Sequence, residues 1–119
     1  MEKHIIVVED DEGLRHGYCK LLGINGYTTY PFSDYRGVTA HLDGGLQADL
    51  LLVDINLPTG TPNGISVSGM ARMRRPGLPV LYITENADHI RHLVPDSDVL
   101  IKPILDEALL ANNGRMLGV

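Results

Sequence analysis

Acidic residues follow two apolar runs of this chain, at the point where each run ends. The run at 5–8 leads into Glu9 and Asp10, and the run at 50–53 leads into Asp54. Apolar runs of this length are typical of strands buried on both faces, and paired parallel strands bring their ends to one edge. Carboxylates gathered there raise one another's pKa values unless a cation lies among them. The pattern therefore predicts a metal ion held by these three carboxylates.

The rest of the chain alternates between strand patterns and helix patterns. Short β-branched and apolar runs predict strands, and apolar residues three and four apart predict helices. The expected strands are 4–8, 27–30, 49–53, 80–83 and 99–101. The expected helices are 12–22 with Tyr18 among its apolar positions, about 34–42 with Ser33 as its cap, about 65–74, a short one at 87–94, and 104–117. The alternation favours an α/β fold with a five-stranded parallel sheet between helices.

Two further polar residues end strands of this predicted sheet. Thr84 follows the fourth strand and Lys102 follows the fifth. In open parallel sheets, ligands bind beyond the carboxyl ends of the strands. We therefore expect a hydroxyl and an ammonium group to join the three carboxylates at one edge.

Composition limits the class of protein. With 119 residues, 44% of them apolar and 21% charged, the chain is expected to fold as one domain, 1–119. A net charge of −5 does not favour a nucleic-acid-binding surface. The single cysteine, Cys19, excludes a disulfide within the chain and favours a reducing cytoplasm. Neither a signal peptide nor a membrane-spanning helix is predicted.

These motifs together resemble the receiver domains of two-component response regulators, over essentially the whole chain. They are an acidic pair after the first strand, Asp54 after the third, Thr84 after the fourth and Lys102-Pro103 after the fifth. The resemblance implies a doubly wound sheet with strand order 2-1-3-4-5. It also implies a sensor histidine kinase or phosphotransfer protein as phosphoryl donor, and a downstream protein effector or a fused output domain. A homodimer stays open.

The resemblance implies a role for each acidic residue. Asp54 matches the phosphoacceptor, and Glu9 and Asp10 match the pair that binds Mg²⁺ together with it. Asn56 matches the position that gives a backbone carbonyl to the metal. Mg²⁺ prefers oxygen ligands and would offset the repulsion between a carboxylate nucleophile and a phosphoryl anion.

The same resemblance implies how the phosphoryl group is sensed. Thr84 matches the hydroxyl that contacts it, Lys102 matches the lysine beside the acceptor, and the bond to Pro103 is expected to be cis. Asn56 and Asn86 match the two positions at which the family tunes the phosphoryl lifetime.

Four features depart from the family pattern. The loop after the acceptor is longer than usual, because Gly64 falls ten residues after Asp54. Glu85 stands where a small residue is usual, and Val99 stands where an aromatic residue usually couples to the hydroxyl. The interval between the fourth and fifth strands is short, which predicts a short fourth helix.

Two other functions remain open from the sequence. One is a receiver-like interaction module whose output does not depend on phosphorylation, as the departures at Glu85 and Val99 would suit. The other is a flavodoxin-like redox protein. The acidic loop 9–12 disfavours the redox protein, because it would repel the phosphate of FMN.

Overall fold

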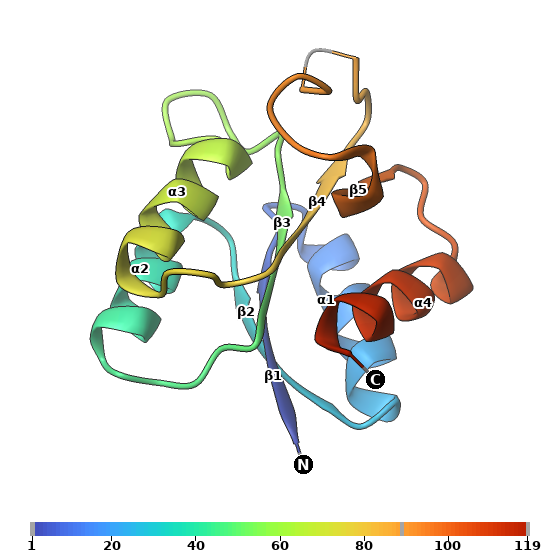
Figure 1. Cartoon of the computed structure of the whole chain (residues 1–119), viewed down its shortest axis with the longest axis horizontal. Coiled ribbons are helices and arrows are strands. Elements are labelled where there is room, and N and C mark those ends of the chain that lie inside the picture. The colour runs from blue at the N-terminus through green and yellow to red at the C-terminus, as the bar shows by residue number, and fades with distance from the viewer. Residues whose placement is uncertain (1, 89, 119) are drawn as a thin grey trace.

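Strands and helices alternate along the chain (Figure 1) in the computed structural model, which describes residues 2–88 and 90–118. The strands are β1 (Lys3–Val8), β2 (Tyr27–Phe32), β3 (Leu50–Asp54), β4 (Val80–Thr84) and β5 (Val99–Ile101). The α-helices in the described ranges are α1 (Glu12–Ile24), α2 (Tyr35–Asp43), α3 (Gly64–Arg74) and α4 (Asp106–Leu117). None of these helices is long and apolar enough to cross a membrane.

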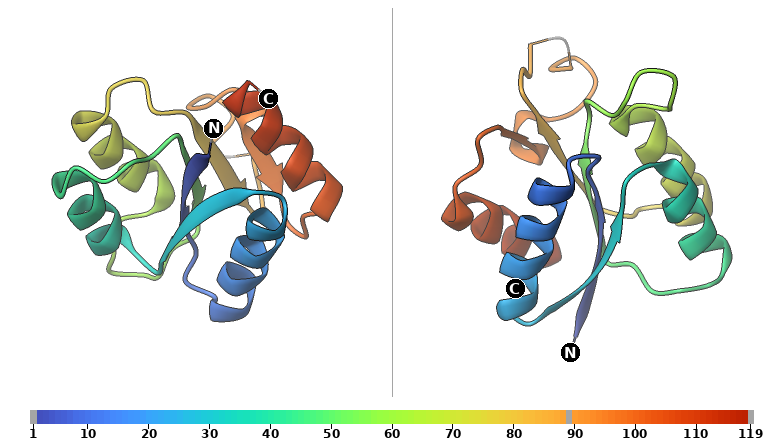
Figure 2. Two further views of the ribbon diagram at one scale, coloured as in Figure 1. Left: turned by 90° about the horizontal axis from the view of Figure 1, so that it is seen from below. Right: turned by 180° about the vertical axis from the view of Figure 1, so that it is seen from behind.

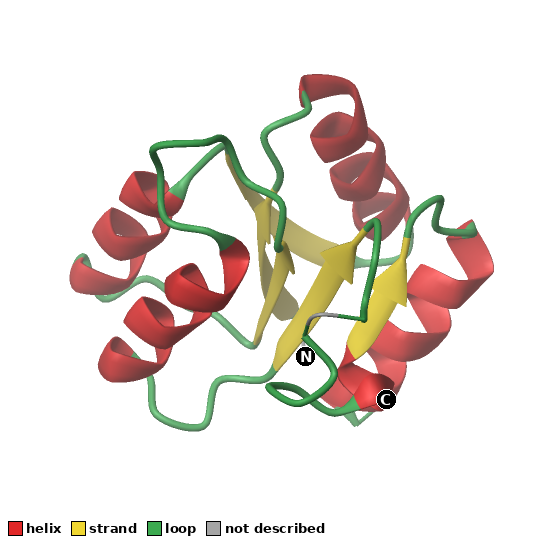
Figure 3. Ribbon diagram, turned by 90° about the horizontal axis from the view of Figure 1, so that it is seen from above, coloured by secondary structure: helices red, strands yellow, loops and turns green. Residues whose placement is uncertain are grey.

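The sheet is parallel and has the strand order β2-β1-β3-β4-β5, as predicted. Helices α1 and α4 cover one face, and α2 and α3 cover the other (Figures 2 and 3). Strands β1 and β3 are neighbours, and Val8 is in register with Val53. Glu9 and Asp54, the residues that follow this pair, therefore lie side by side at the carboxyl edge.

Strands β3 and β4 are buried along their whole length, which explains their uninterrupted apolar runs. Every residue of β3 and β4 is buried. In β1, Ile6 and Val8 belong to the core under α2 and α3, whereas Ile5 and Val7 belong to the core under α1 and α4. Side chains of β1 thus pack against helices on both faces of the sheet.

The segment after β4 differs from the prediction of a helix at 87–94. Its described residues form turns, with the Ile90 N–H bonded to the Ala87 carbonyl and the Leu93 N–H to the Ile90 carbonyl. His89 lies outside the described residues. Pro95 disfavours a helical conformation at the residue before it, and a 3₁₀ turn at Asp96–Asp98 then leads into β5.

Two helix starts also differ from the prediction. The cap of α2 is Asp34 rather than Ser33, because the Asp34 carboxylate accepts the Arg36 N–H at 2.9 Å. Helix α4 begins at Asp106 rather than 104, since Leu105 before it has an extended backbone.

Candidate functional site

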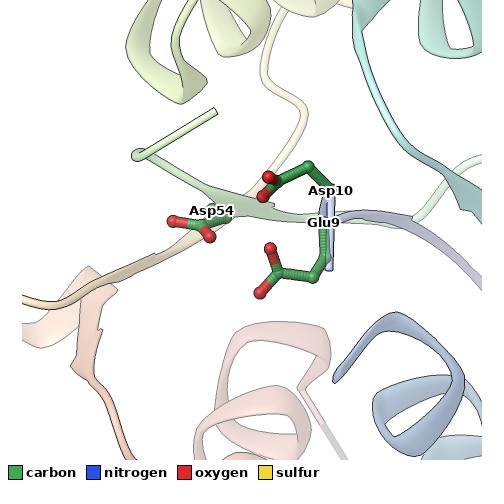
Figure 4. A group of neighbouring side chains, drawn as sticks. All are labelled: Glu9, Asp10 and Asp54. Carbon is green, nitrogen blue, oxygen red and sulfur yellow. The ribbon is translucent and has the colours of Figure 1, made fainter. Parts of the chain in front are cut away.

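The three predicted carboxylates lie together at the ends of β1 and β3 (Figure 4). Glu9, Asp10 and Asp54 each offer one oxygen atom within 4.8 Å of the others. Glu9 and Asp54 are buried, at 0% and 1% exposed, whereas Asp10 is exposed. An all-carboxylate set that is open to solvent on one side suits Mg²⁺, which keeps several of its waters.

Lys102 reaches the two buried carboxylates from the end of β5. Its Nζ donates to Glu9 Oε1 at 2.8 Å and to Asp54 Oδ2 at 2.7 Å. The lysine side chain is only 15% exposed, so these ion pairs are shielded from solvent. The Lys102 N–H donates to the Thr84 carbonyl, which pairs the end of β5 with the end of β4. The bond from Lys102 to Pro103 is cis, as expected.

Burial and proximity shift the pKa values at this edge. Burial, followed by a hydrogen bond with Asp54, raises the pKa of Glu9 from 4.5 to about 7, although Lys102 acts in the opposite direction. Burial alone would lower the pKa of Lys102, but its hydrogen bonds to Asp54 and Glu9 outweigh this effect and raise it. The site is therefore an anionic cluster that a single ammonium group neutralises incompletely.

We expect the metal-free protein to lose stability as the pH rises from about 4.5 to about 7. In this window folded Glu9 binds a proton that the unfolded chain has released, so deprotonation favours unfolding. The effect should reach at most a few kcal/mol. Urea unfolding in the presence of a chelator, at pH values across the window, measures it. Glu9→Gln should flatten the slope, whereas Glu12→Gln, at an exposed position of α1, should leave it unchanged.

Added Mg²⁺ should reverse this trend, because a carboxylate must be ionised to bind a metal. The stabilisation by Mg²⁺ should therefore grow as the pH rises through the pKa of Glu9. An unaltered slope in Glu9→Gln would contradict the assignment of this titration to Glu9.

The loop after β3 connects Asp54 to the end of β4. The Asn56 N–H donates to Asp54 Oδ1 at 2.8 Å, so both acceptor oxygens are held, one by this amide and one by Lys102. The Thr84 hydroxyl, in a residue that is 0% exposed, donates to Asn56 Oδ1 at 3.0 Å. The structure thus brings the predicted hydroxyl beside the acceptor loop.

Gly64 explains how helix α3 approaches Asp54 so closely. A Cβ atom at this position would lie 2.4 Å from the Asp54 carbonyl oxygen and 2.7 Å from the Ile55 Cα. The Gly64 N–H also donates to the Ile55 carbonyl at 3.1 Å. The longer loop therefore returns the chain to the end of β3 at a position that has no room for a side chain.

Of the positions that depart from the family pattern, Glu85 follows β4 at this edge, whereas Val99 is the first residue of β5 and pairs with Tyr82. Glu85 is exposed and Val99 is half-buried. The buried aromatic residue nearest in register to Val99 is Tyr82 on β4, whose hydroxyl lies 2.8 Å from Ser68 Oγ of α3. Tyr82 is therefore tied to α3.

Sequence reasoning missed two side chains of the site. The side-chain carboxamide of Asn56 contacts Thr84. The sequence predicted only a backbone carbonyl ligand at Asn56 and an effect of this position on the phosphoryl lifetime. Tyr18 lines a pocket with Lys102 and Glu85, and burial raises its pKa to about 12. Helical spacing marked Tyr18 only as apolar, and no local signal predicts a contact between Asn56 and a residue 28 positions away.

Comparison with known proteins gives consistent matches. Residues 5–112 match the family of the response regulator receiver domain. The response regulator MprA of Mycobacterium ulcerans is 31% identical over 98% of this chain, which spans about half of that relative's length (51%).

Two solved structures have the same fold over nearly the whole chain. A response regulator receiver protein from Sinorhizobium medicae has a TM-score of 0.87 at 25% identity, with 99% of this chain and 96% of that one covered. The N-terminal domain of a response regulator/sensory box/GGDEF three-domain protein from Carboxydothermus hydrogenoformans has a TM-score of 0.82 at 25% identity, with 98% and 94% covered.

Proposed function

The chain belongs to the response regulator receiver domain family, and on this basis we propose that it accepts a phosphoryl group on Asp54. One observation carries the proposal. The Asp54 carboxylate is buried at the end of β3, with Lys102 on one oxygen, the Asn56 amide on the other, and the carboxylates of Glu9 and Asp10 beside it. A carboxylate held in this way is oriented for in-line attack on phosphorus.

We infer that Mg²⁺ is held by the side chains of Glu9, Asp10 and Asp54 and by the backbone carbonyl of Asn56. When bound, the metal supplies positive charge between two anions, the nucleophile and the phosphoryl group. In the transfer, an Asp54 oxygen forms a bond to phosphorus as the bond from phosphorus to the donor's histidine nitrogen breaks. The ammonium group of Lys102 compensates for the negative charge of the phosphoryl oxygens during the transfer. Thr84 supplies a hydroxyl that donates to the phosphoryl group.

The donor in this proposal is the phosphohistidine of a sensor kinase or phosphotransfer protein, and the output is a protein effector or a fused output domain. The length of the curated relative and the multidomain context of one structural neighbour support an output outside the receiver fold. We assign 1–119 to one receiver domain, and the cytoplasmic location stays a prediction from the sequence.

Incubation with a small phosphodonor tests the proposal directly. We expect one phosphoryl group per chain, bound as a hydroxylamine-sensitive acyl phosphate, and only in the presence of Mg²⁺. Intact-mass spectrometry detects the adduct. Its absence at saturating donor and Mg²⁺, both with the small donor and with a phosphorylated histidine phosphotransfer protein, would contradict the proposal.

The alternative is a receiver-like module whose output does not depend on phosphorylation. Val99 in place of an aromatic residue, and the turns that replace a helix in the described part of 87–94, are the observations that favour it. Backbone amide NMR spectra recorded with and without beryllofluoride and Mg²⁺ distinguish the phosphorylation-dependent output from this alternative. Shifts that extend into residues 85–101 support a phosphorylation-dependent output, and shifts confined to the acidic cluster support the alternative.

A further inference from the structure

Asn56 is bonded to both the predicted acceptor and the predicted sensing hydroxyl. Its backbone N–H donates to Asp54 Oδ1 at 2.8 Å. Its side-chain Oδ1 accepts from Thr84 Oγ1 at 3.0 Å and lies 3.4 Å from the backbone nitrogen of Glu85. One residue of the acceptor loop therefore contacts the end of β4 through its carboxamide.

The Thr84 hydroxyl has a single proton, and its hydrogen bonds are with Asn56 and Asn86 rather than with Asp54. Among the described residues, the acceptors within its reach are Asn56 Oδ1 at 3.0 Å and the Asn86 carbonyl at 3.1 Å. The hydroxyl oxygen also accepts the Asn86 N–H at 3.3 Å. Because Thr84 is 0% exposed, its hydroxyl depends on protein partners.

We propose that the Asn56 carboxamide is a latch that holds Thr84 in the resting arrangement, and that a phosphoryl group on Asp54 has to displace it. This inference rests on the proposed function. A hydroxyl donates one hydrogen bond at a time, so the phosphoryl oxygens and Asn56 Oδ1 compete for the same proton. The hydrogen bond from Thr84 to the phosphoryl group is the stronger of the two, because the phosphoryl oxygens are charged and the amide oxygen of Asn56 is neutral.

The departure at Val99 makes this competition decisive. The family's aromatic partner is absent from that position, and Tyr82 beside it is tied to Ser68. Within the described part of the chain, the hydrogen bonds that oppose movement of the Thr84 hydroxyl are those with Asn56 and Asn86. Asn56 is then a positioning residue that acts on the phosphorylated state through Thr84.

A double-mutant cycle on the purified chain tests the latch. The readout is the affinity for beryllofluoride, titrated at saturating Mg²⁺ as a stand-in for the phosphoryl group. Asn56→Ala removes the nearer of the two competing acceptors, leaves the Asn86 carbonyl in place and keeps the backbone amide of residue 56. We therefore expect binding about three- to tenfold tighter, the equivalent of at most one neutral hydrogen bond. Thr84→Val should weaken binding, because it removes the hydroxyl.

The decisive quantity is the coupling between Asn56 and Thr84 in the affinity for beryllofluoride. In the Thr84→Val background, Asn56→Ala should have no further effect, whereas in a Thr84→Ser background the tightening should return. If Asn56 only stabilised its own loop, Asn56→Ala would change the affinity for beryllofluoride equally in every background, and that result would overturn the proposal. Asn25→Ala is the matched control, because the Asn25 side chain bonds only to Leu21 at the end of α1 among the hydrogen bonds of the described chain, and it should leave affinity unchanged.

The cycle also separates this inference from the proposed function. If the unaltered chain binds beryllofluoride but the cycle shows no coupling, the latch is wrong and phosphoryl acceptance stands. If the unaltered chain fails to bind beryllofluoride with Mg²⁺, both proposals fail.

Discussion

Asp54→Asn is expected to reduce phosphoryl incorporation to background while leaving the protein folded. An amide nitrogen or oxygen at this position is a poor nucleophile compared with a carboxylate, so no acyl phosphate can form. Asparagine keeps the size of the side chain and can still accept the Asn56 N–H that now bonds to Asp54. Phosphodonor labelling followed by intact-mass spectrometry measures the loss, and circular dichroism checks the fold.

Two neighbouring acids provide matched controls for this substitution. Asp10→Asn should lower the affinity for Mg²⁺ but retain labelling at higher Mg²⁺ concentration, because Asp10 is an exposed member of the cluster. Asp11→Asn should have no effect, since the Asp11 side chain caps α1 by accepting the Leu14 N–H at 2.9 Å, and asparagine caps equally well. Persistent labelling of Asp54→Asn at a single new site would show that another acid is the acceptor.

The same substitution should also change the titration of Glu9. Asp54 raises the pKa of Glu9 through a hydrogen bond and through its charge. Without that charge, Glu9 should ionise at a lower pH, and the window in which stability is lost should end at a lower pH than in the unaltered chain. Unfolding curves of metal-free Asp54→Asn therefore report on the electrostatic coupling independently of phosphorylation.

The sheet and its functional edge could be predicted from the sequence because their signals are local. Leu50 to Val53 are buried on both faces, which requires an apolar run, and a parallel sheet then aligns the residues that follow each run. The predicted proximity of Glu9 and Asp54 depends only on this alignment of β1 with β3. The same argument predicts Lys102 at this edge, whereas its ion pairs with Glu9 and Asp54 are known only from the structure.

The parts that the sequence did not predict depend on contacts between distant residues. Residues 87–94 carry a helical apolar pattern, but the short connection to β5 and Pro95 leave turns in the described part of the segment. The contact between Asn56 and Thr84 joins two loops through side chains, so no periodicity reveals it. At α2, Ser33 and Asp34 are both good caps, and only the backbone geometry selects Asp34.

Gly64→Ala is expected to destabilise the protein by about 2 to 4 kcal/mol, a large effect for one methyl group. The added Cβ would meet the Asp54 carbonyl oxygen at 2.4 Å and the Ile55 Cα at 2.7 Å, and both are backbone atoms. Neither can move easily, because the Ile55 N–H is bonded to the Ile83 carbonyl at 2.8 Å, which ties the end of β3 to β4. Helix α3 would have to retreat from the strand.

Urea unfolding of Gly64→Ala beside Gly69→Ala isolates this effect. Gly69 lies in the same helix, but a Cβ atom there would meet nothing within 4 Å, so alanine should stabilise the helix by up to about 1 kcal/mol. A retreat of α3 would also shift the Asp54 backbone and with it the carboxylate, so Gly64→Ala should bind beryllofluoride more weakly, whereas Gly69→Ala should not. Equal stability of the two variants would mean that α3 is free to move, and the position of Asp54 would then not depend on this contact.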